Sequence, residues 1–157
     1  MDRLHRTRLL FGDYAIEKLR SATVMVVGCG AVGSFAIEAL ARSGVGRIIV
    51  VDFDSVDASN INRQLFALES TVGNPKVAVA ANRIHDINPE TDVTVLNLFF
   101  DDNTEIDVLP DYIIDAIDTV SSKVALYKWA HKHNVALISS MGAASKTDIS
   151  QIKIAPI

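Results

Sequence analysis

Three glycines lie in a pattern that suits the binding of a phosphate. Gly28, Gly30 and Gly33 form the motif G-x-G-x-x-G directly after an apolar run and directly before an amphipathic one. The first glycine permits a tight turn, the second lets a phosphate approach the backbone, and the third lets a helix pack close to the preceding strand. The start of that helix offers free N–H groups and a partial positive charge to an anion. The motif therefore predicts a nucleotide-binding loop.

Asp52 extends this predicted site toward a ribose. It directly follows the second apolar run, 47–51, and lies about 20 residues beyond the motif, where a carboxylate meets the ribose of a bound dinucleotide. Its two oxygens can accept hydrogen bonds from both ribose hydroxyls. The motif and the carboxylate suit NAD and ATP equally, and a glycine turn without a ligand is the alternative.

Two cations and two amides follow, and together they favour a triphosphate. Asn60, Arg63 and Gln64 come after the second apolar run, and Lys76 opens the next amphipathic one. Arg63 and Lys76 would bring two positive charges to a β,γ-phosphate tail, which gains negative charge as pyrophosphate leaves. An NAD dehydrogenase needs no such charges. Taken singly, Arg63 is better explained as an exposed loop arginine, and Lys76 as a lysine on the surface of a helix.

Strands and helices alternate along the chain and would hold these residues at one edge of a sheet. Continuous apolar runs rich in β-branched residues are typical of strands buried on both faces, and apolar residues three and four apart are typical of helices. The alternation predicts a single domain, 1–157, with an α/β fold: a Rossmann-like, doubly wound, mostly parallel sheet with helices on both faces. The expected strands are 23–27, 47–51, 92–99, 112–114, 135–139 and an edge strand over 149–154; the expected helices are 14–20, 31–42, 75–87 and 120–133, after an arm over 3–10.

The segment 54–74 breaks this alternation. It is too long for an ordinary connection between a strand and a helix, and it is rich in polar residues. We expect it to form a loop or a short helix that lies over the ligand site.

The composition excludes several classes of protein. Of the 157 residues 49% are apolar, yet no apolar run reaches the roughly 18 residues of a membrane span, and no signal peptide is visible. The single cysteine, Cys29, excludes an internal disulfide and a zinc site built from cysteines, so we expect a cytoplasmic protein. The net charge of −4 argues against nucleic-acid binding through overall charge, although a local basic patch is compatible with it.

The polar insertion carries a family resemblance. The segments 52–56, 59–64 and 72–76 resemble the D-x-D-x-V, S-N-x-N-R-Q and G-x-x-K signature of the E1-like (ThiF-type) activating enzymes. That family includes the activators of ubiquitin and of the thiamin and molybdopterin sulfur carriers, and the tRNA threonylcarbamoyladenosine dehydratases. The resemblance extends from about Arg3 to Ser140, and its insertion is more specific than the glycine motif.

The resemblance implies that the chain binds ATP and Mg²⁺ and adenylates a carboxylate. Asp52 would then hold the ribose, and Asn60, Arg63 and Lys76 would contact the triphosphate, with Gln64 beside them. The segment 115–118 resembles the family's D-x-x-D, in which the second aspartate, Asp118, would bind Mg²⁺ near the α-phosphate. The alternative for Asp118 is an N-cap of the helix over 120–133.

The N-terminal segment 3–12 resembles the family's R-F-x-R-T-x-L-L-x-G arm. In the family an arginine of this arm reaches across a homodimer to the γ-phosphate bound by the neighbouring subunit. The resemblance assigns that role to Arg6, with Arg3 as the second candidate. A frayed basic terminus is the alternative.

Within the family, the tRNA-modifying branch fits this sequence best. Members that act on ubiquitin-like proteins commonly carry a catalytic cysteine and often a C-x-x-C pair, whereas Cys29 lies in the glycine loop. The segments 6–7, 87–90, 115–118 and 142–144, with Asp148 downstream, resemble the threonylcarbamoyladenosine dehydratases. Those enzymes activate a carboxylate on the modified adenosine next to the tRNA anticodon and then cyclise it with loss of water.

Other functions stay open. The first alternative is adenylation of the C-terminus of a ubiquitin-like sulfur carrier, with that carrier or a cysteine desulfurase as protein partner. The second is an NAD-dependent oxidoreductase or a nucleotide-sensing module. The third is the inactive half of a heterodimer, and the presence of Arg63, Lys76 and Asp118 together argues against it. Family members continue well beyond the position of Ile157, so we expect the nucleotide-binding half here, without the substrate-facing part.

Overall fold

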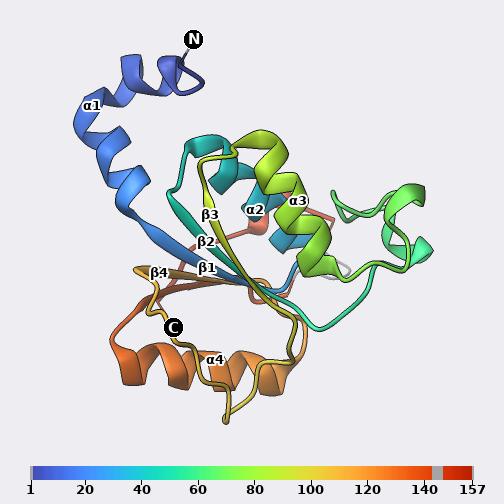
Figure 1. Ribbon diagram of the computed structural model, residues 1–157. Coiled ribbons are helices and arrows are strands. Elements are labelled where there is room, and N and C mark those ends of the chain that lie inside the picture. The colour runs from blue at the N-terminus through green and yellow to red at the C-terminus, as the bar shows by residue number, and fades with distance from the viewer. Residues whose placement is uncertain (1, 143–146, 157) are drawn as a thin grey trace.

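A sheet of five parallel strands forms the centre of the chain (Figure 1). The computed structural model describes residues 2–142 and 147–156. The strand order is β3-β2-β1-β4-β5, so the direction of winding reverses between β1 and β4. At such a reversal the connections leave on opposite sides, and a crevice opens at the carboxyl ends of the strands. The strands are β1 (Thr23–Val27), β2 (Arg47–Val51), β3 (Asp92–Leu96), β4 (Tyr112–Asp115) and β5 (Ala136–Ser139).

Helices cover both faces of this sheet. In Figure 1, α2 (Ala31–Ser43) and α3 (Lys76–Ile87) lie on one face, and α4 (Val120–His133) lies on the other. The side chains of alternate residues of β1 point to opposite faces of the sheet. Val26 packs in the hydrophobic cluster that contains Ile37 of α2, and Met25 packs in the one that contains Leu126 of α4. Burial on both sides explains the continuous apolar runs. The prediction of a doubly wound, Rossmann-like sheet is confirmed.

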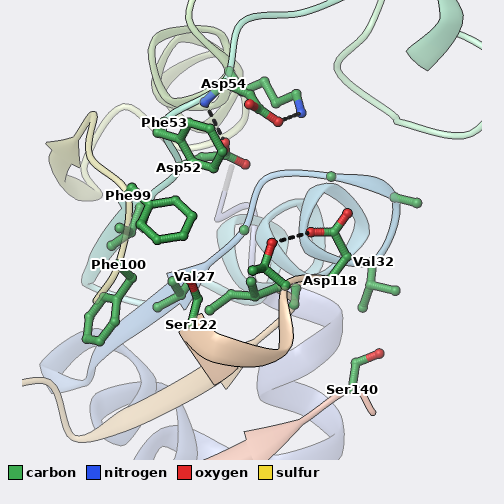
Figure 2. A pocket seen from close by; sticks show the side chains of 18 of the residues that line it. Val27, Val32, Asp52, Phe53, Asp54, Phe99, Phe100, Asp118, Ser122 and Ser140 are labelled. Carbon is green, nitrogen blue, oxygen red and sulfur yellow. Dashed lines mark hydrogen bonds and ion pairs between the residues drawn. The ribbon is translucent and has the colours of Figure 1, made fainter. Parts of the chain in front are cut away.

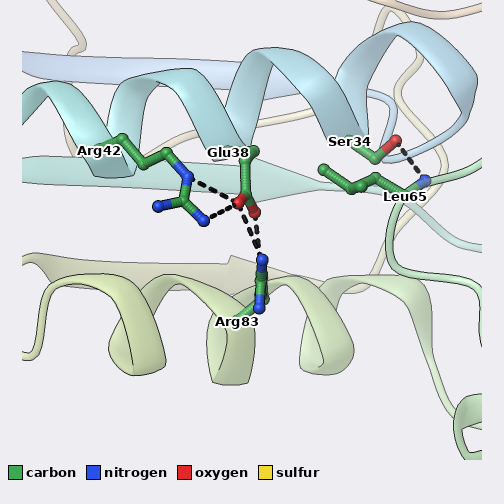
Figure 3. Close-up of polar contacts among 5 residues, drawn as sticks. All are labelled: Ser34, Glu38, Arg42, Leu65 and Arg83. Atoms are coloured by element: carbon green, nitrogen blue, oxygen red, sulfur yellow. Dashed lines mark hydrogen bonds and ion pairs between the residues drawn. The ribbon is translucent and has the colours of Figure 1, made fainter.

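Polar contacts join α2 to α3 and to the insertion (Figure 3). Both carboxylate oxygens of Glu38 accept hydrogen bonds from Arg83, at 2.8 and 2.9 Å, and Arg42 donates to the same carboxylate. The hydrogen bonds from Arg83 hold the pKa of Glu38 below its usual value. One turn earlier, the hydroxyl of buried Ser34 accepts a hydrogen bond from the backbone N–H of Leu65 at 3.1 Å. The insertion is therefore anchored on the first half of α2.

The N-terminal segment differs from the expectation. The arm predicted over 3–10 is helical, and α1 runs from His5 to Ser21 with a kink at Gly12, where φ is 80°. The guanidinium of Arg8 pairs with the carboxylate of Asp2, before the helix, and with that of Asp13, beyond the kink, so Arg8 bridges the two helical pieces. In Figure 1, α1 projects from the sheet at the N-terminal end of β1.

The predicted edge strand over 149–154 is wrong. Residues Ile149–Gln151 form a 3-10 helix, and Asp148 caps it by accepting a hydrogen bond from the backbone N–H of Ser150 at 3.0 Å. A local bond of this kind competes with strand pairing. The third strand is also shorter than expected, because its pairing with β2 ends at Leu96.

The first prediction concerns the glycine that brings α2 against β1. A Cβ on Gly33 would lie 1.7 Å from the carbonyl oxygen of Gly28, which is backbone and cannot move without disturbing β1. We expect Gly33→Ala to lower the free energy of unfolding by about 1–3 kcal/mol or more, measured by chemical or thermal denaturation. Gly30→Ala is the matched control, since its Cβ would meet only the side chain of Gln64, at 3.8 Å. Equal stability of the two variants would contradict this packing.

Candidate functional site

A cavity of about 490 Å³ opens at the carboxyl ends of β1, β2 and β4 (Figure 2). It lies where the winding of the sheet reverses, which is the usual place for a ligand in a fold of this kind. Apolar and aromatic side chains line one part of it, and charged side chains line another. Its lining residues are Val27, Gly28, Gly30, Ala31, Val32, Val51, Asp52, Phe53, Asp54, Arg63, Gln64, Lys76, Leu98, Phe99, Phe100, Ala116, Ile117, Asp118, Thr119, Ser122, Ser140 and Gly142.

The glycine motif forms the floor of this cavity. Gly28 has a φ of 99°, and a Cβ there would lie 2.6 Å from the carbonyl oxygen of Ala116, so the turn needs glycine on both counts. Gly30 borders the cavity, and α2 begins at the next residue. The first N–H groups of a helix lack partners within the helix, so this end of α2 can donate to an anion in the cavity.

Asp52 has more partners than the sequence suggested. One carboxylate oxygen accepts a hydrogen bond from the backbone N–H of Cys29 at 2.7 Å, and the other accepts one from the backbone N–H of Asp54 at 2.9 Å. The side chain also borders the cavity, and each carboxylate oxygen can accept a further bond. Asp52 therefore joins the glycine loop to the start of the insertion and leaves acceptor capacity for a ligand.

The two cations lie at the same cavity, as the spacing predicted. Lys76 is buried, and its Nζ lies 2.8 Å from a carboxylate oxygen of Asp54. Arg63 is exposed and donates hydrogen bonds, each of 2.9 Å, to the carbonyl of Ser59 and the side chain of Asn62. Nothing in the sequence reading assigned Asp54 to Lys76. The backbone N–H of Lys76 also donates a hydrogen bond to the carbonyl of Asp54 at 2.9 Å. In the sequence, the second aspartate of the D-x-D segment was the only available sign of this pair.

Three other predicted residues do not line the cavity. Gly33 packs α2 against the strand end. Asn60 is buried in the insertion, where its side-chain oxygen accepts a hydrogen bond from the backbone N–H of Asp57 at 3.1 Å. Arg6 lies on α1, which projects away from the sheet (Figure 1). A contact of Arg6 with a triphosphate requires a second subunit and stays a prediction, as does a contact of Asn60.

Asp118 lies on the opposite side of the cavity from the aromatic residues (Figure 2). Its side chain is exposed, and it forms a long hydrogen bond of 3.4 Å with the hydroxyl of Thr119. The N-cap of α4 is Thr119, so the alternative reading of Asp118 as that N-cap is wrong. Within residues 2–142 and 147–156, no group of three or more metal-ligating side chains gathers at one point.

An aromatic wall closes the other side, and the sequence reading did not single it out. The rings of Phe53 and Phe99 meet edge to face with their centroids 5.1 Å apart, and Phe100 packs in the same way on Trp129. Phe99 was expected inside the third strand, but the strand ends before it. Nearby, the buried hydroxyl of Ser122 has no hydrogen-bond partner in the described part of the chain. Buried hydroxyls usually have a hydrogen-bond partner, so this one is an exception among the described residues.

The sequence reading also missed the role of Asp115, which is 2% exposed. Its carboxylate accepts hydrogen bonds from Lys123 at 3.0 Å, from the hydroxyl of Ser139 and from the backbone N–H of Ile117. Lys123 in turn donates to the carbonyl of Ser140 at 2.7 Å. The sequence sign of this ion pair was an aspartate at the end of an apolar strand followed by a lysine on the next helix.

Three further sequence observations have a structural outcome. Burial raises the pKa of the Cys29 thiol far above its ordinary value, so the thiolate needed of a nucleophile is disfavoured. No helix in the described ranges is long and apolar enough to cross a membrane. Of the segment 142–144, Gly142 borders the cavity, whereas Ala143 and Ala144 lie outside the described residues.

Comparison with known proteins gives three informative similarities. The tRNA threonylcarbamoyladenosine dehydratase of Bacillus subtilis (strain 168) is 53% identical over 155 residues, which cover 97% of this chain and 61% of that protein. The crystal structure of the E. coli tRNA N6-threonylcarbamoyladenosine dehydratase in complex with ATP superposes with a TM-score of 0.92 at 41% identity, covering 96% of this chain and 63% of that one. The molybdopterin-synthase adenylyltransferase of Salmonella typhimurium is 37% identical over 134 residues, covering 84% of this chain and 53% of that protein.

The chain thus spans less than two thirds of the length of each of these relatives. A family model described as the ThiF family matches residues 4–156, which include the glycine loop, the polar insertion and the cavity. With this match and the identity to the dehydratases, the chain belongs to the ThiF family.

Proposed function

We propose that this chain is the ATP-binding part of an enzyme that adenylates the carboxylate of threonylcarbamoyladenosine in tRNA and so forms the cyclic modified base. The observation that carries the proposal is the meeting of Arg63, Lys76 and the glycine loop at one cavity. The similarity to a dehydratase solved in complex with ATP supports the same ligand and substrate class.

The cavity has a matching surface for each part of ATP. The aromatic wall at Phe53 and Phe99 suits a flat base. Asp52 has acceptor capacity left for a ribose. Gly30 and the start of α2 suit a phosphate, and Arg63 with Lys76 suits the charged tail.

Asp118 is the residue that would hold Mg²⁺. Its carboxylate borders the cavity and has no ion-pair partner among the described residues, and Mg²⁺ bound to nucleotides needs only one or two carboxylates beside the phosphate oxygens. When bound there, the ion would neutralise negative charge on the phosphates.

The chemistry follows from these positions. The substrate carboxylate attacks the α-phosphorus of ATP, and the bond from that phosphorus to the oxygen bridging to the β-phosphorus breaks. Pyrophosphate leaves with the electron pair, and the acyl-adenylate remains. Arg63 and Lys76 offset the charge that grows on the leaving group. No protein nucleophile is needed, in keeping with the buried Cys29. We further propose a homodimer in which Arg6 of one subunit reaches the triphosphate of the other.

A second candidate is adenylation of the C-terminus of a sulfur-carrier protein. The identity of 37% to a molybdopterin-synthase adenylyltransferase favours it. The two candidates differ in the molecule that presents the carboxylate.

Pyrophosphate exchange separates these candidates. Full-length protein would be mixed with ATP, Mg²⁺ and labelled pyrophosphate, together with either tRNA that carries threonylcarbamoyladenosine or a sulfur-carrier protein. We expect label to enter ATP with the modified tRNA only, and the same tRNA without the modification is the matched control. Exchange with the carrier alone would reverse the assignment.

Arg63→Ala is expected to reduce exchange by about 10²–10³-fold, since a positioned charge acts mainly on the transition state. The unfolding midpoint should stay unchanged because Arg63 is exposed and contacts only its own segment. The matched control is Arg42→Ala, which removes an exposed arginine from the same face of the sheet without touching the cavity. Exchange within a few-fold of the wild type in Arg63→Ala would contradict the assignment.

Asp118→Asn is expected to abolish magnesium-dependent exchange and to leave the fold intact. The substitution removes the negative charge but preserves the shape of an exposed side chain. Circular dichroism would check the fold, and exchange at rising Mg²⁺ would measure the defect. Thr119→Ala is the control, because it removes the neighbouring hydroxyl and no carboxylate. An Asp118→Asn variant as active as the wild type would remove Asp118 from the mechanism.

A further inference from the structure

A partly buried polar cluster lies beside the cavity and has none of the roles assigned above. It consists of Asp115 at the end of β4, Lys123 in the first turns of α4, and Ser139 and Ser140 at the end of β5. The side chains of Asp115 and Lys123 are only 3% and 15% exposed. Lys123 does not border the cavity, whereas Ser140 does.

The contacts of the cluster tie together two walls of the cavity. One carboxylate oxygen of Asp115 accepts a hydrogen bond from the backbone N–H of Ile117 at 3.0 Å, next to Asp118. The other oxygen accepts a hydrogen bond from the Nζ of Lys123 at 3.0 Å. The same Nζ donates to the carbonyl of Ser140 at 2.7 Å. One ammonium group therefore links the segment that carries Asp118 to the end of β5.

Few other contacts hold Asp118 in place. Among residues 2–142 and 147–156, the N-cap of α4 makes no side-chain capping hydrogen bond, and the carboxylate of Asp118 has only the long contact with Thr119. The position of its carboxylate thus depends on the backbone at 116–117, where the N–H of Ala116 is bound to Val27 of β1 and that of Ile117 is bound to Asp115. Without Lys123, Asp115 would keep an unpaired charge in the interior and would be drawn toward other partners.

We propose that Lys123 is a positioning residue, which acts through Asp115 and Ser140 to hold Asp118 where it can bind Mg²⁺ on the nucleotide. The inference rests on the proposed function, since it presupposes ATP with Mg²⁺ in the cavity. Residues behind a metal ligand commonly change metal affinity by about 10–100-fold when they are replaced.

The test is the affinity for ATP with and without Mg²⁺, measured by titration calorimetry on full-length protein. In the wild type, Mg²⁺ is expected to strengthen ATP binding. In Lys123→Met this gain should fall by about 10-fold or more, while the affinity in EDTA changes less than about threefold. Lys123→Arg, which keeps the charge, should recover most of the gain. Lys128→Met is the matched control, because Lys128 on the same helix forms an exposed pair with Asp102 at 3.2 Å.

The outcomes separate the two proposals. A wild type that binds no ATP would overturn the proposed function itself. The positioning role would be overturned if Mg²⁺ strengthened ATP binding by the same factor in the wild type and in Lys123→Met. This holds even if that variant unfolds at a lower temperature. Should Lys123→Met not fold, Ser139→Ala removes one hydrogen bond from Asp115 and keeps the ion pair. We then expect a smaller loss of the gain, and no loss would overturn the inference.

Discussion

The close approach of three backbone segments at the end of β1 is the constraint on which the site depends. A side chain at Gly28 would collide with Ala116, and one at Gly33 would collide with Gly28. Because both side chains are absent, α2 can start directly against the strand end, and the segment after β4 can pass beneath it. The start of α2 and the end of β4 therefore meet where the winding of the sheet reverses, and the cavity lies between them.

Hydrogen bonds then fasten the polar insertion to this frame. Ser34 holds Leu65 from α2, and the carboxylate of Asp52 joins the glycine loop to Asp54. Asp54 in turn pairs with Lys76 at the start of α3. A ligand that contacts Asp52 thus contacts a chain of bonds that reaches the lysine. In the proposed ATP complex, binding of the ribose at Asp52 and the placement of Lys76 at the phosphate tail would therefore be physically connected.

The charges of the cavity differ in how they are balanced. The ammonium of Lys76 lies against Asp54, and that of the half-buried Lys123, beside the cavity, lies against Asp115, so each of these lysines has a carboxylate partner. Arg63 instead donates to a carbonyl and an amide, which are neutral. Arg63 lines the cavity, and no carboxylate within residues 2–142 and 147–156 forms an ion pair with it. The described part of the cavity therefore offers an anionic ligand an arginine without an ion-pair partner and a lysine that is paired with Asp54.

The sequence by itself determined the sheet, the helices on both faces and the edge at which the site lies, because these follow from local patterns. Buried strands read as apolar runs such as 47–51, and the glycine spacing requires a turn between a strand and a helix. The periodicity of apolar residues does not show which segments pair with distant ones. Phe99 lies outside β3, because the pairing of β3 with β2 ends at Leu96. The isoleucines after Asp148 resemble a strand in sequence, but Ile149–Gln151 form a 3-10 helix. The partners of Asp52, Lys76 and Lys123 were likewise decided only by the tertiary structure, since each pair joins residues from separate elements that the sheet brings together.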